Sequence, residues 1–184
     1  MGKTSLVVPY LFSKVEPKIS TVFLNFSAKT RPKETQLAIE SKLNKKGKTL
    51  FGARPNESNV IFIDDVNMPE LEKEGAQPTI ELLRNFLDFG GFYDRQKLFW
   101  KQVVETTLVG CGATPSGGRN KLNTRFMRHH MLLCIPEPAE SNLKKIFGSI
   151  LKGFFNAWGF SEQLKKISDG IVSATLDFYR TIRK

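Results

Sequence analysis

Two short stretches of the sequence carry residue types suited to phosphate chemistry. Residues 2–4 read G-K-T and match the end of the pattern G-x-x-x-x-G-K-[ST], whose lysine reaches the β- and γ-phosphates and whose hydroxyl meets Mg²⁺. Further along, Asp64 and Asp65 directly follow the apolar run 60–63, so we expect them at the carboxyl end of a buried strand. In open α/β sheets ligands bind at that end, and Mg²⁺ prefers carboxylate oxygens together with retained waters.

Neither stretch is sufficient by itself. A bare G-K-T triplet occurs by accident in many proteins, and a strand followed by an aspartate-rich turn is a common structural feature. Together they predict a site for ATP or ADP, in which Thr4 and Asp64 hold Mg²⁺ and Asp65 takes the catalytic position that orients the attacking water. The residues expected to bind nucleotide are Gly2, Lys3, Thr4, Ser5 and Asp64.

The composition is that of an ordinary globular chain of about one domain, with 184 residues, 40% hydrophobic and 25% charged. The longest apolar runs are far too short to cross a bilayer, and the N-terminus lacks the features of a signal peptide, so we expect no membrane partner. Cys111 and Cys134 lie in apolar contexts and are expected to be small buried hydrophobes in a reducing compartment.

The net charge of +10 raises the hypothesis of nucleic-acid binding. The lysines are dispersed, as expected of solvated helix faces, and no nucleic-acid-binding motif accompanies them, so this partner is disfavoured. Two alternatives to a module of a larger protein stay open. One is an autonomous P-loop nucleotide-binding protein that starts at Met1, and the other is a non-enzymatic basic interaction domain.

Strand-like runs alternate with helical periodicity, which predicts an α/β fold with a mainly parallel sheet. We expect Pro9 to kink or end the first helix. The expected helices cover residues 4–14, 31–47, 77–91, 122–129, 140–155 and 161–184. The expected strands cover residues 21–26, 60–63, 105–113 and 130–138, with a short hairpin at 91–102. Because only helices follow residue 138, we predict an α/β domain over 1–138 and the start of a helical subdomain over 139–184.

Several longer motifs point to one family. The run I-F-I-D-D-V-N-M-P at 61–69 is followed by G-A-Q-P at 75–78, Y-D-R at 93–95 and G-G-R-N at 117–120, with R-F-M-R-H-H at 125–130. This series closely resembles the AAA+ modules of dynein heavy chains, and most of all the third of the six ring modules in its axonemal form. The resemblance implies an AAA+ P-loop NTPase core followed by the start of an α-helical lid.

The resemblance also implies roles for single residues. Arg125 matches the arginine finger that one module presents to its neighbour's nucleotide, with Arg128 as the second candidate; the alternative for both is a solvated basic helix face. Ala113 falls where the family carries a polar sensor-1 residue, with Thr114 beside it. Asp65 replaces the usual glutamate and is one methylene shorter. These departures imply a site that binds nucleotide and hydrolyses it slowly or not at all.

Finally, the resemblance implies what surrounds this chain. It would begin inside the Walker A loop, without the strand that normally precedes that loop, and would stop before the sensor-2 arginine of the lid. We therefore expect the isolated chain to be unstable or to aggregate. The implied partners are neighbouring AAA+ modules and, through the parent, dynein intermediate and light chains and microtubules. The implied location is cytoplasmic, in the cytoskeleton of the ciliary or flagellar axoneme.

Overall fold

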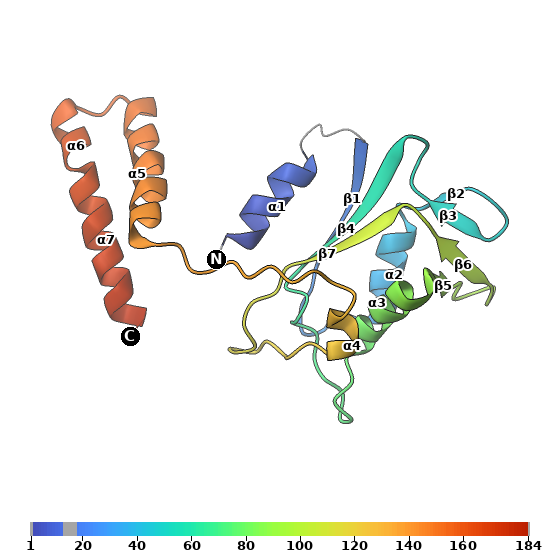
Figure 1. Cartoon of the computed structure of the whole chain (residues 1–184). Coiled ribbons are helices and arrows are strands. Elements are labelled where there is room, and N and C mark those ends of the chain that lie inside the picture. The colour runs from blue at the N-terminus through green and yellow to red at the C-terminus, as the bar shows by residue number, and fades with distance from the viewer. Residues whose placement is uncertain (1, 13–17, 184) are drawn as a thin grey trace. The chain divides into compact units, whose positions relative to one another are not determined.

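The computed structural model describes residues 2–12 and 18–183, and divides them into two compact units, which we describe separately (Figure 1). The helices of the first unit, residues 2–133, are α1 (Lys3–Phe12), α2 (Pro32–Glu40), α3 (Pro78–Phe89) and α4 (Thr124–Met127). Its strands are β1 (Lys18–Asn25), β2 (Asn44–Lys45), β3 (Leu50–Gly52), β4 (Glu57–Asp64), β5 (Gly91–Tyr93), β6 (Trp100–Val103) and β7 (Thr106–Gly110). The helical unit, from Cys134 onward, contains α5 (Glu140–Ala157), α6 (Glu162–Lys166) and α7 (Ser168–Arg183). The predicted domain boundary after residue 138 stays a prediction, and the expected start at Met1 lies outside the described residues.

The main sheet has the strand order β1-β4-β7, and all its pairs are parallel. In this register Asn25 pairs with Asp64 and Ile63 pairs with Gly110, so the carboxyl ends of the strands meet at one edge. The predicted α/β fold with a mainly parallel sheet is therefore confirmed. The central strand β4 is almost wholly buried, which is why its sequence is a continuous apolar run and does not alternate.

Helices cover both faces of this sheet. Successive side chains of β4 point to opposite sides, so the strand contributes to the core on each face. Ile61 and Ile63 belong to the larger core cluster, with residues of α2 and α3, while Val60 and Phe62 pack against Leu11 of α1. The helix α1 continues through Pro9 to Phe12, so Pro9 does not end it. Packing of its apolar side chains on the sheet offsets the backbone hydrogen bond that proline removes. The last two residues of the helix expected at 4–14 lie outside the described residues.

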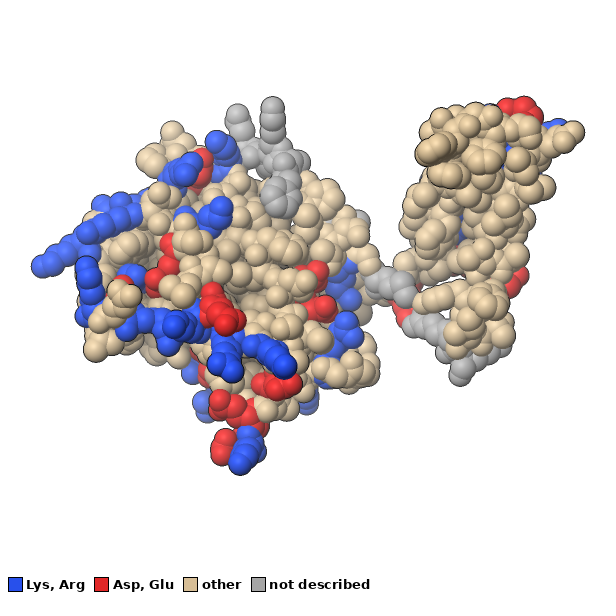
Figure 2. Space-filling view, turned by 180° about the vertical axis from the view of Figure 1, so that it is seen from behind, with Lys and Arg blue, Asp and Glu red and all other residues tan. Residues whose placement is uncertain are grey.

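A smaller sheet, with the order β2-β3-β6-β5, corrects one prediction. The helix expected over 31–47 ends at Glu40, and residues 44–45 form β2, which pairs antiparallel with β3. The amides of Lys46 and Gly47 both donate to the carbonyl of Leu50, so pairing across the sheet overrides the helical propensity of this lysine-rich stretch. Figure 2 shows Lys and Arg gathered over the end of the first unit that carries this hairpin. The hairpin predicted at 91–102 is confirmed as β5 and β6.

The strand predicted at 130–138 is wrong, because these residues form no strand. The side chains of Met131, Leu132 and Leu133 are 87%, 64% and 76% exposed. Among the described residues, β7 pairs only with β4, so no neighbouring strand lies beside this apolar run to satisfy its backbone groups. Within residues 2–12 and 18–183, no helix is long and apolar enough to cross a membrane.

The helical unit is an antiparallel pair, α5 and α7, joined through the short α6 (Figure 1). Glu140 at the start of α5 forms a 2.8 Å ion pair with Arg180 near the end of α7. The single helix predicted over 161–184 is instead broken at Ile167, which ends α6, and Lys184 lies outside the described residues. The buried residues of α7 are Ser168, Val172 and Leu176, and none of them belongs to the apolar series that recurs every three to four residues in the sequence.

Candidate nucleotide site

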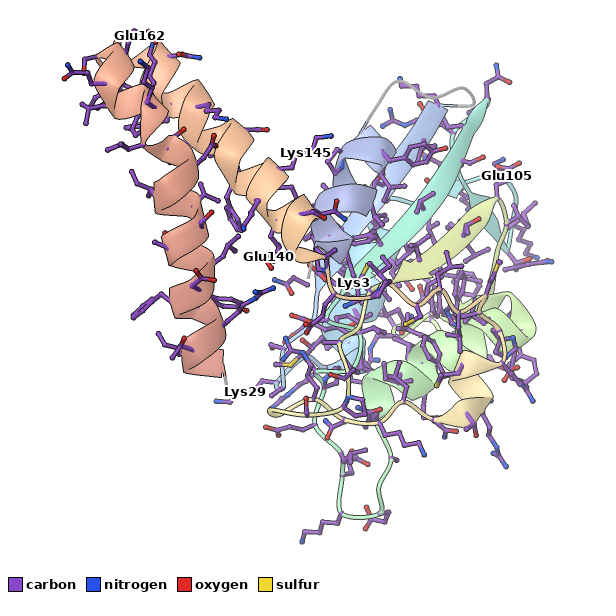
Figure 3. All side chains as sticks on the ribbon, turned by 60° about the vertical axis from the view of Figure 1, so that its left-hand side comes forward. Lys3, Lys29, Glu105, Glu140, Lys145 and Glu162 are labelled. Carbon is purple, nitrogen blue, oxygen red and sulfur yellow. The ribbon has the colours of Figure 1, made fainter. Side chains whose placement is uncertain are left out.

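The start of α1 lies at the carboxyl end of β4. The hydroxyl of Thr4 donates a 2.7 Å hydrogen bond to Oδ2 of Asp64, although the two residues are 60 positions apart. The other oxygen of Asp64 accepts a 3.0 Å hydrogen bond from the backbone amide of Asp65. Figure 3 shows Lys3 at the N-terminal end of α1. The tertiary structure thus brings one residue from each of the two predicted motifs into direct contact.

Lys3 and Asp64 also lie near Cys111, at the end of β7. Burial raises the pKa of the Cys111 thiol, the carboxylate of Asp64 raises it further, and the ammonium of Lys3 opposes the shift. The thiol is therefore held neutral, which argues against a nucleophilic role and agrees with the prediction that Cys111 is a small buried hydrophobe. Cys134, which we also expected to be buried, is exposed instead, because the strand expected around it does not form.

Asp65 occupies a turn of unusual backbone geometry. Its φ is +51°, in the left-handed region that aspartate tolerates better than most residues. Its carboxylate is 38% exposed and pairs with the guanidinium of Arg119, with 3.4 Å between Oδ1 and Nη2. The two consecutive carboxylates therefore have different partners: Asp64 meets Thr4, and Asp65 meets Arg119.

A network of amide side chains holds Arg119 at this place. Asn120 donates through its backbone amide to the carbonyl of Asn67 (2.9 Å) and through Nδ2 to the carbonyl of Pro69 (2.7 Å). The buried Gln77 donates a second 2.7 Å hydrogen bond to the same carbonyl of Pro69. The motifs N-M-P, Q-P and G-G-R-N, distant in the chain, thus meet around one carbonyl oxygen. In the sequence these letters indicate only a family, and they predict no role for Asn67, Gln77, Arg119 or Asn120. The available signal was a glutamine directly before Pro78 and an asparagine two residues before Pro69.

Ala113 presents its backbone to the site. Its carbonyl accepts a 2.8 Å hydrogen bond from Nδ2 of Asn67, while its methyl side chain offers no polar group. Oδ1 of Asn67 is buried and has no hydrogen-bond partner in the part of the chain that the structure describes. Thr114, the next residue, is exposed. An amide acceptor of Asn67 is therefore left open beside the position where the family's polar sensor-1 side chain was expected.

The two candidate finger arginines differ in their surroundings. Arg125 lies on α4, which Asn123 caps by accepting a 2.9 Å hydrogen bond from the Arg125 amide, and the residue is exposed. Among the described residues, no hydrogen bond or ion pair joins its side chain to Asp64 or Asp65. Arg128 instead pairs with Asp88 at the end of α3, at 2.7 Å.

The Asp88 carboxylate anchors the segment that carries Arg125. Its Oδ1 lies 2.7 Å from Nη2 of Arg128 and 2.7 Å from Nε2 of His129, and its other oxygen pairs with Arg84 of the same helix. The hydrogen bond from Arg128 lowers the pKa of Asp88, so the carboxylate stays ionised to a lower pH than a free aspartate does. Arg128 is thereby engaged within this unit, whereas within residues 2–12 and 18–183 the side chain of Arg125 has no hydrogen-bond or ion-pair partner.

The residues at this edge fit Mg²⁺ and a nucleoside phosphate in their chemistry. Thr4 and Asp64 offer a hydroxyl and a carboxylate, both hard oxygen ligands, within hydrogen-bonding distance of each other. The N-terminus of the ten-residue helix α1 adds unpaired backbone amides and the positive end of the helix dipole, and Lys3 adds a cation. Gly2 has φ of +80° and is exposed, as is Ser5 in the first turn.

Comparison with known proteins defines the class. A family model described as "P-loop containing dynein motor region" matches residues 1–138. The chain therefore belongs to the dynein heavy-chain family, in which this segment is a P-loop AAA+ module.

The chain is 46% identical over 181 residues to Dynein axonemal heavy chain 6 of Homo sapiens, covering 97% of this chain and 4% of the relative. It is 37% identical over 180 residues to Dynein axonemal heavy chain 12 of Rattus norvegicus, covering 97% of this chain and 6% of the relative. It is 36% identical over 184 residues to the Dynein-1-beta heavy chain, flagellar inner arm I1 complex, of Chlamydomonas reinhardtii, covering 100% of this chain and 4% of the relative. The chain thus spans 4% to 6% of the length of these relatives.

Proposed function

We propose that this chain is the nucleotide-binding part of one AAA+ module of a dynein heavy chain, and that it binds ATP or ADP together with Mg²⁺. The observation that carries the proposal is the 2.7 Å hydrogen bond from Thr4 to Asp64, which joins a Walker A hydroxyl to a Walker B carboxylate. In this assignment Gly2, Lys3 and Ser5 contact the phosphates. Bound Mg²⁺ would supply charge neutralisation at the β- and γ-phosphates.

Hydrolysis at this site is proposed to be slow or absent, and the role of the site regulatory. The carboxylate of Asp65 ends one methylene, about 1.5 Å, short of a glutamate at the same position, and misplacement by about 1 Å can cost on the order of 10²-fold in rate. The side chain of Ala113 is a methyl group, which cannot hydrogen-bond a water or a phosphate. These two features together disfavour the positioning of an attacking water.

The partners and the location follow from the relatives. Exposed Arg125 would face the nucleotide of a neighbouring module of the same heavy chain and stabilise phosphate charge there. Through the parent heavy chain the module would serve movement along microtubules, with dynein intermediate and light chains as further partners. The relatives named above are axonemal and flagellar, so we place the parent in the cytoskeleton of the cilium or flagellum. Correspondence to the third ring module remains part of this proposal.

The test uses an extended polypeptide, in which the segment that precedes the matching region of Dynein axonemal heavy chain 6 is joined before Gly2 of this chain. Affinity for ATP and ADP is measured by calorimetry with and without Mg²⁺. We expect Mg²⁺-dependent binding that Lys3→Ala and Asp64→Ala each weaken by at least tenfold. Lys145→Ala, an exposed change in the helical unit, is the control. Binding undiminished in both site variants would overturn the assignment.

Slow hydrolysis has its own test in the same polypeptide. The double change Asp65→Glu with Ala113→Asn restores the longer carboxylate and a polar side chain next to it. The backbone carbonyl of Ala113 that accepts from Asn67 is kept in this variant. We expect phosphate release under single-turnover conditions to rise by at least tenfold over the unchanged polypeptide. Rapid phosphate release by the unchanged polypeptide would show that the site hydrolyses ATP despite Asp65 and Ala113.

A further inference from the structure

The loop after β7 brings an arginine of this chain to the predicted catalytic carboxylate. Gly117 and Gly118 have φ of +60° and +84°, values that glycine adopts without strain, and they turn the chain back toward residues 65–69. The next two residues are Arg119 and Asn120. Since Asn120 is held by the carbonyls of Asn67 and Pro69, the position of Arg119 is fixed by its neighbour.

Among the described residues, Arg119 uses little of its hydrogen-bonding capacity. A guanidinium carries five N–H donors in a rigid fork. One nitrogen, Nη2, meets Oδ1 of Asp65 at 3.4 Å, which is long for a charge-assisted hydrogen bond. Nε is buried and has no partner in the part of the chain that the structure describes. A buried donor without a partner is costly, and at a proposed phosphate site an incoming anion would satisfy it.

The ion pair between Asp65 and the guanidinium of Arg119 is weak. Asp65 offers one oxygen at 3.4 Å, its side chain is 38% exposed, and that of Arg119 is 33% exposed. Both groups are therefore partly hydrated, and such a pair contributes little to stability. A phosphate group offers oxygens that match the arginine fork in a bidentate manner, so it would compete well against this single contact.

We propose that Arg119 is the residue by which this site distinguishes a nucleoside triphosphate from a diphosphate. This inference rests on the proposed nucleotide site. Without a terminal phosphate, Arg119 pairs with Asp65. With a terminal phosphate, the guanidinium turns from Asp65 to the phosphate oxygens, and the carboxylate of Asp65 is released. The exchange makes the engagement of Asp65 depend on the nucleotide that is bound.

The experiment measures ATP and ADP affinities of the extended polypeptide in Mg²⁺, for the unchanged chain, Arg119→Ala, Arg119→Lys, Asp65→Asn and the double variant. We expect Arg119→Ala to lower the affinity for ATP by about tenfold and the affinity for ADP by less than threefold, because a hydrogen bond to a charged group is lost only with ATP. Arg119→Lys should recover part of the preference, since it keeps the charge without the fork. Lys121→Ala, an exposed lysine two residues along the same loop, is the matched control.

Asp65→Asn gives the signature that a merely structural ion pair would not produce. Removing the competing carboxylate should raise the ratio of ATP to ADP affinity when Arg119 is present. In the Arg119→Ala background, Asp65→Asn should raise this ratio less. The double-mutant cycle gives the difference between the two effects as the coupling between Asp65 and Arg119. Circular dichroism of each variant checks that the fold is kept.

The outcomes separate the two proposals. If the extended polypeptide binds neither nucleotide, the proposed function fails and this inference fails with it. Another outcome is that both nucleotides bind, while Arg119→Ala lowers the two affinities equally or lowers neither. In that case the nucleotide site stands and the role of Arg119 is overturned. A cycle in which the two changes are additive also overturns it.

Discussion

The hydroxyl of Thr4 donates to a carboxylate oxygen of Asp64 across 2.7 Å, and this hydrogen bond joins the start of α1 to the carboxyl end of the central strand β4. The N-terminus of α1 and the carboxyl end of β4 meet at the edge where parallel sheets bind their ligands. The fold thereby brings two motifs that are separated by 60 positions into contact.

Thr4→Val in the extended polypeptide removes the hydroxyl and keeps the shape of the side chain. We expect the Mg²⁺-dependent part of ATP affinity to fall by about tenfold, since a hard oxygen ligand is lost. Thr4→Ser keeps the hydroxyl and should retain most of the affinity. Titration of ATP by calorimetry at several Mg²⁺ concentrations measures both. If Thr4→Val and Thr4→Ser behave alike, the hydroxyl is not a ligand.

Gln77→Ala should destabilise the first unit by about 1–3 kcal/mol, because Gln77 is 5% exposed and donates a 2.7 Å hydrogen bond to the carbonyl of Pro69. Gln102→Ala, an exposed change on β6, is the matched control and should shift stability by less than about 0.5 kcal/mol. Urea unfolding followed by circular dichroism gives both values. Equal effects would show that the hydrogen bond to Pro69 carries no stability.

Gly91→Ala should destabilise strongly, by about 1–3 kcal/mol or more. A β-carbon at this position would lie 2.1 Å from the backbone carbonyl oxygen of Lys101 on the paired strand, so the β5–β6 hairpin would have to move. At Gly47, in the turn between β2 and β3, a β-carbon would meet only Cβ of Leu50 at 3.5 Å, an ordinary contact. Gly47→Ala is thus the comparison, and urea midpoints that shift equally would contradict the close approach.

Asp94 should make stability depend on pH in the acid range. The hydrogen bond from Lys101, an ion pair of 2.7 Å, lowers the pKa of Asp94 from 3.8 to about 2. Because the folded pKa lies below the unfolded value, the stabilisation is present above pH 4 and is lost as the pH falls toward 2. Lys101 also pairs with Glu40 at 3.0 Å. Asp94→Asn should therefore flatten the stability profile between pH 4 and 2, measured by urea unfolding at each pH; an unchanged slope would contradict the shift.

The helical unit should bind apolar dyes and self-associate at high concentration. A cavity of about 660 Å³ opens between α5 and α7, and much apolar surface near it is exposed. The side chains that line it include Leu143, Phe147, Ile150, Phe154, Ile171 and Leu176. Figure 2 shows that the visible face of this unit carries few charges.

The dye test compares two changes on α5. Phe147→Ser with Ile150→Ser should lower both dye fluorescence and light scattering, because both residues line the cavity. Lys145→Ser, exposed on the same helix, should leave them unchanged. A chain that stays monomeric and binds no dye would count against the expectation that it aggregates in isolation.

Much of the fold could be predicted from residue order alone. The buried run at 60–63, the amphipathic helix ended by Gly90 and the hairpin after it depend on local patterns, and each was found where expected. The stretch 41–47 could not be read locally: its lysines suit a helix, and only pairing of β2 with β3 decides otherwise. The apolar run 131–135 was predicted to be a strand and is not one, because a strand forms only where another strand lies beside it.

The site divides in the same way. The sequence by itself determined which residue types are available for the predicted phosphate and Mg²⁺ chemistry, because Lys3, Thr4, Asp64 and Asp65 sit in short motifs. Only the tertiary structure decided that Asp65 meets Arg119 and that Pro69 gathers Gln77 and Asn120. Side-chain identity follows from the local chain, whereas a contact across 54 positions depends on how the sheet and its loops pack.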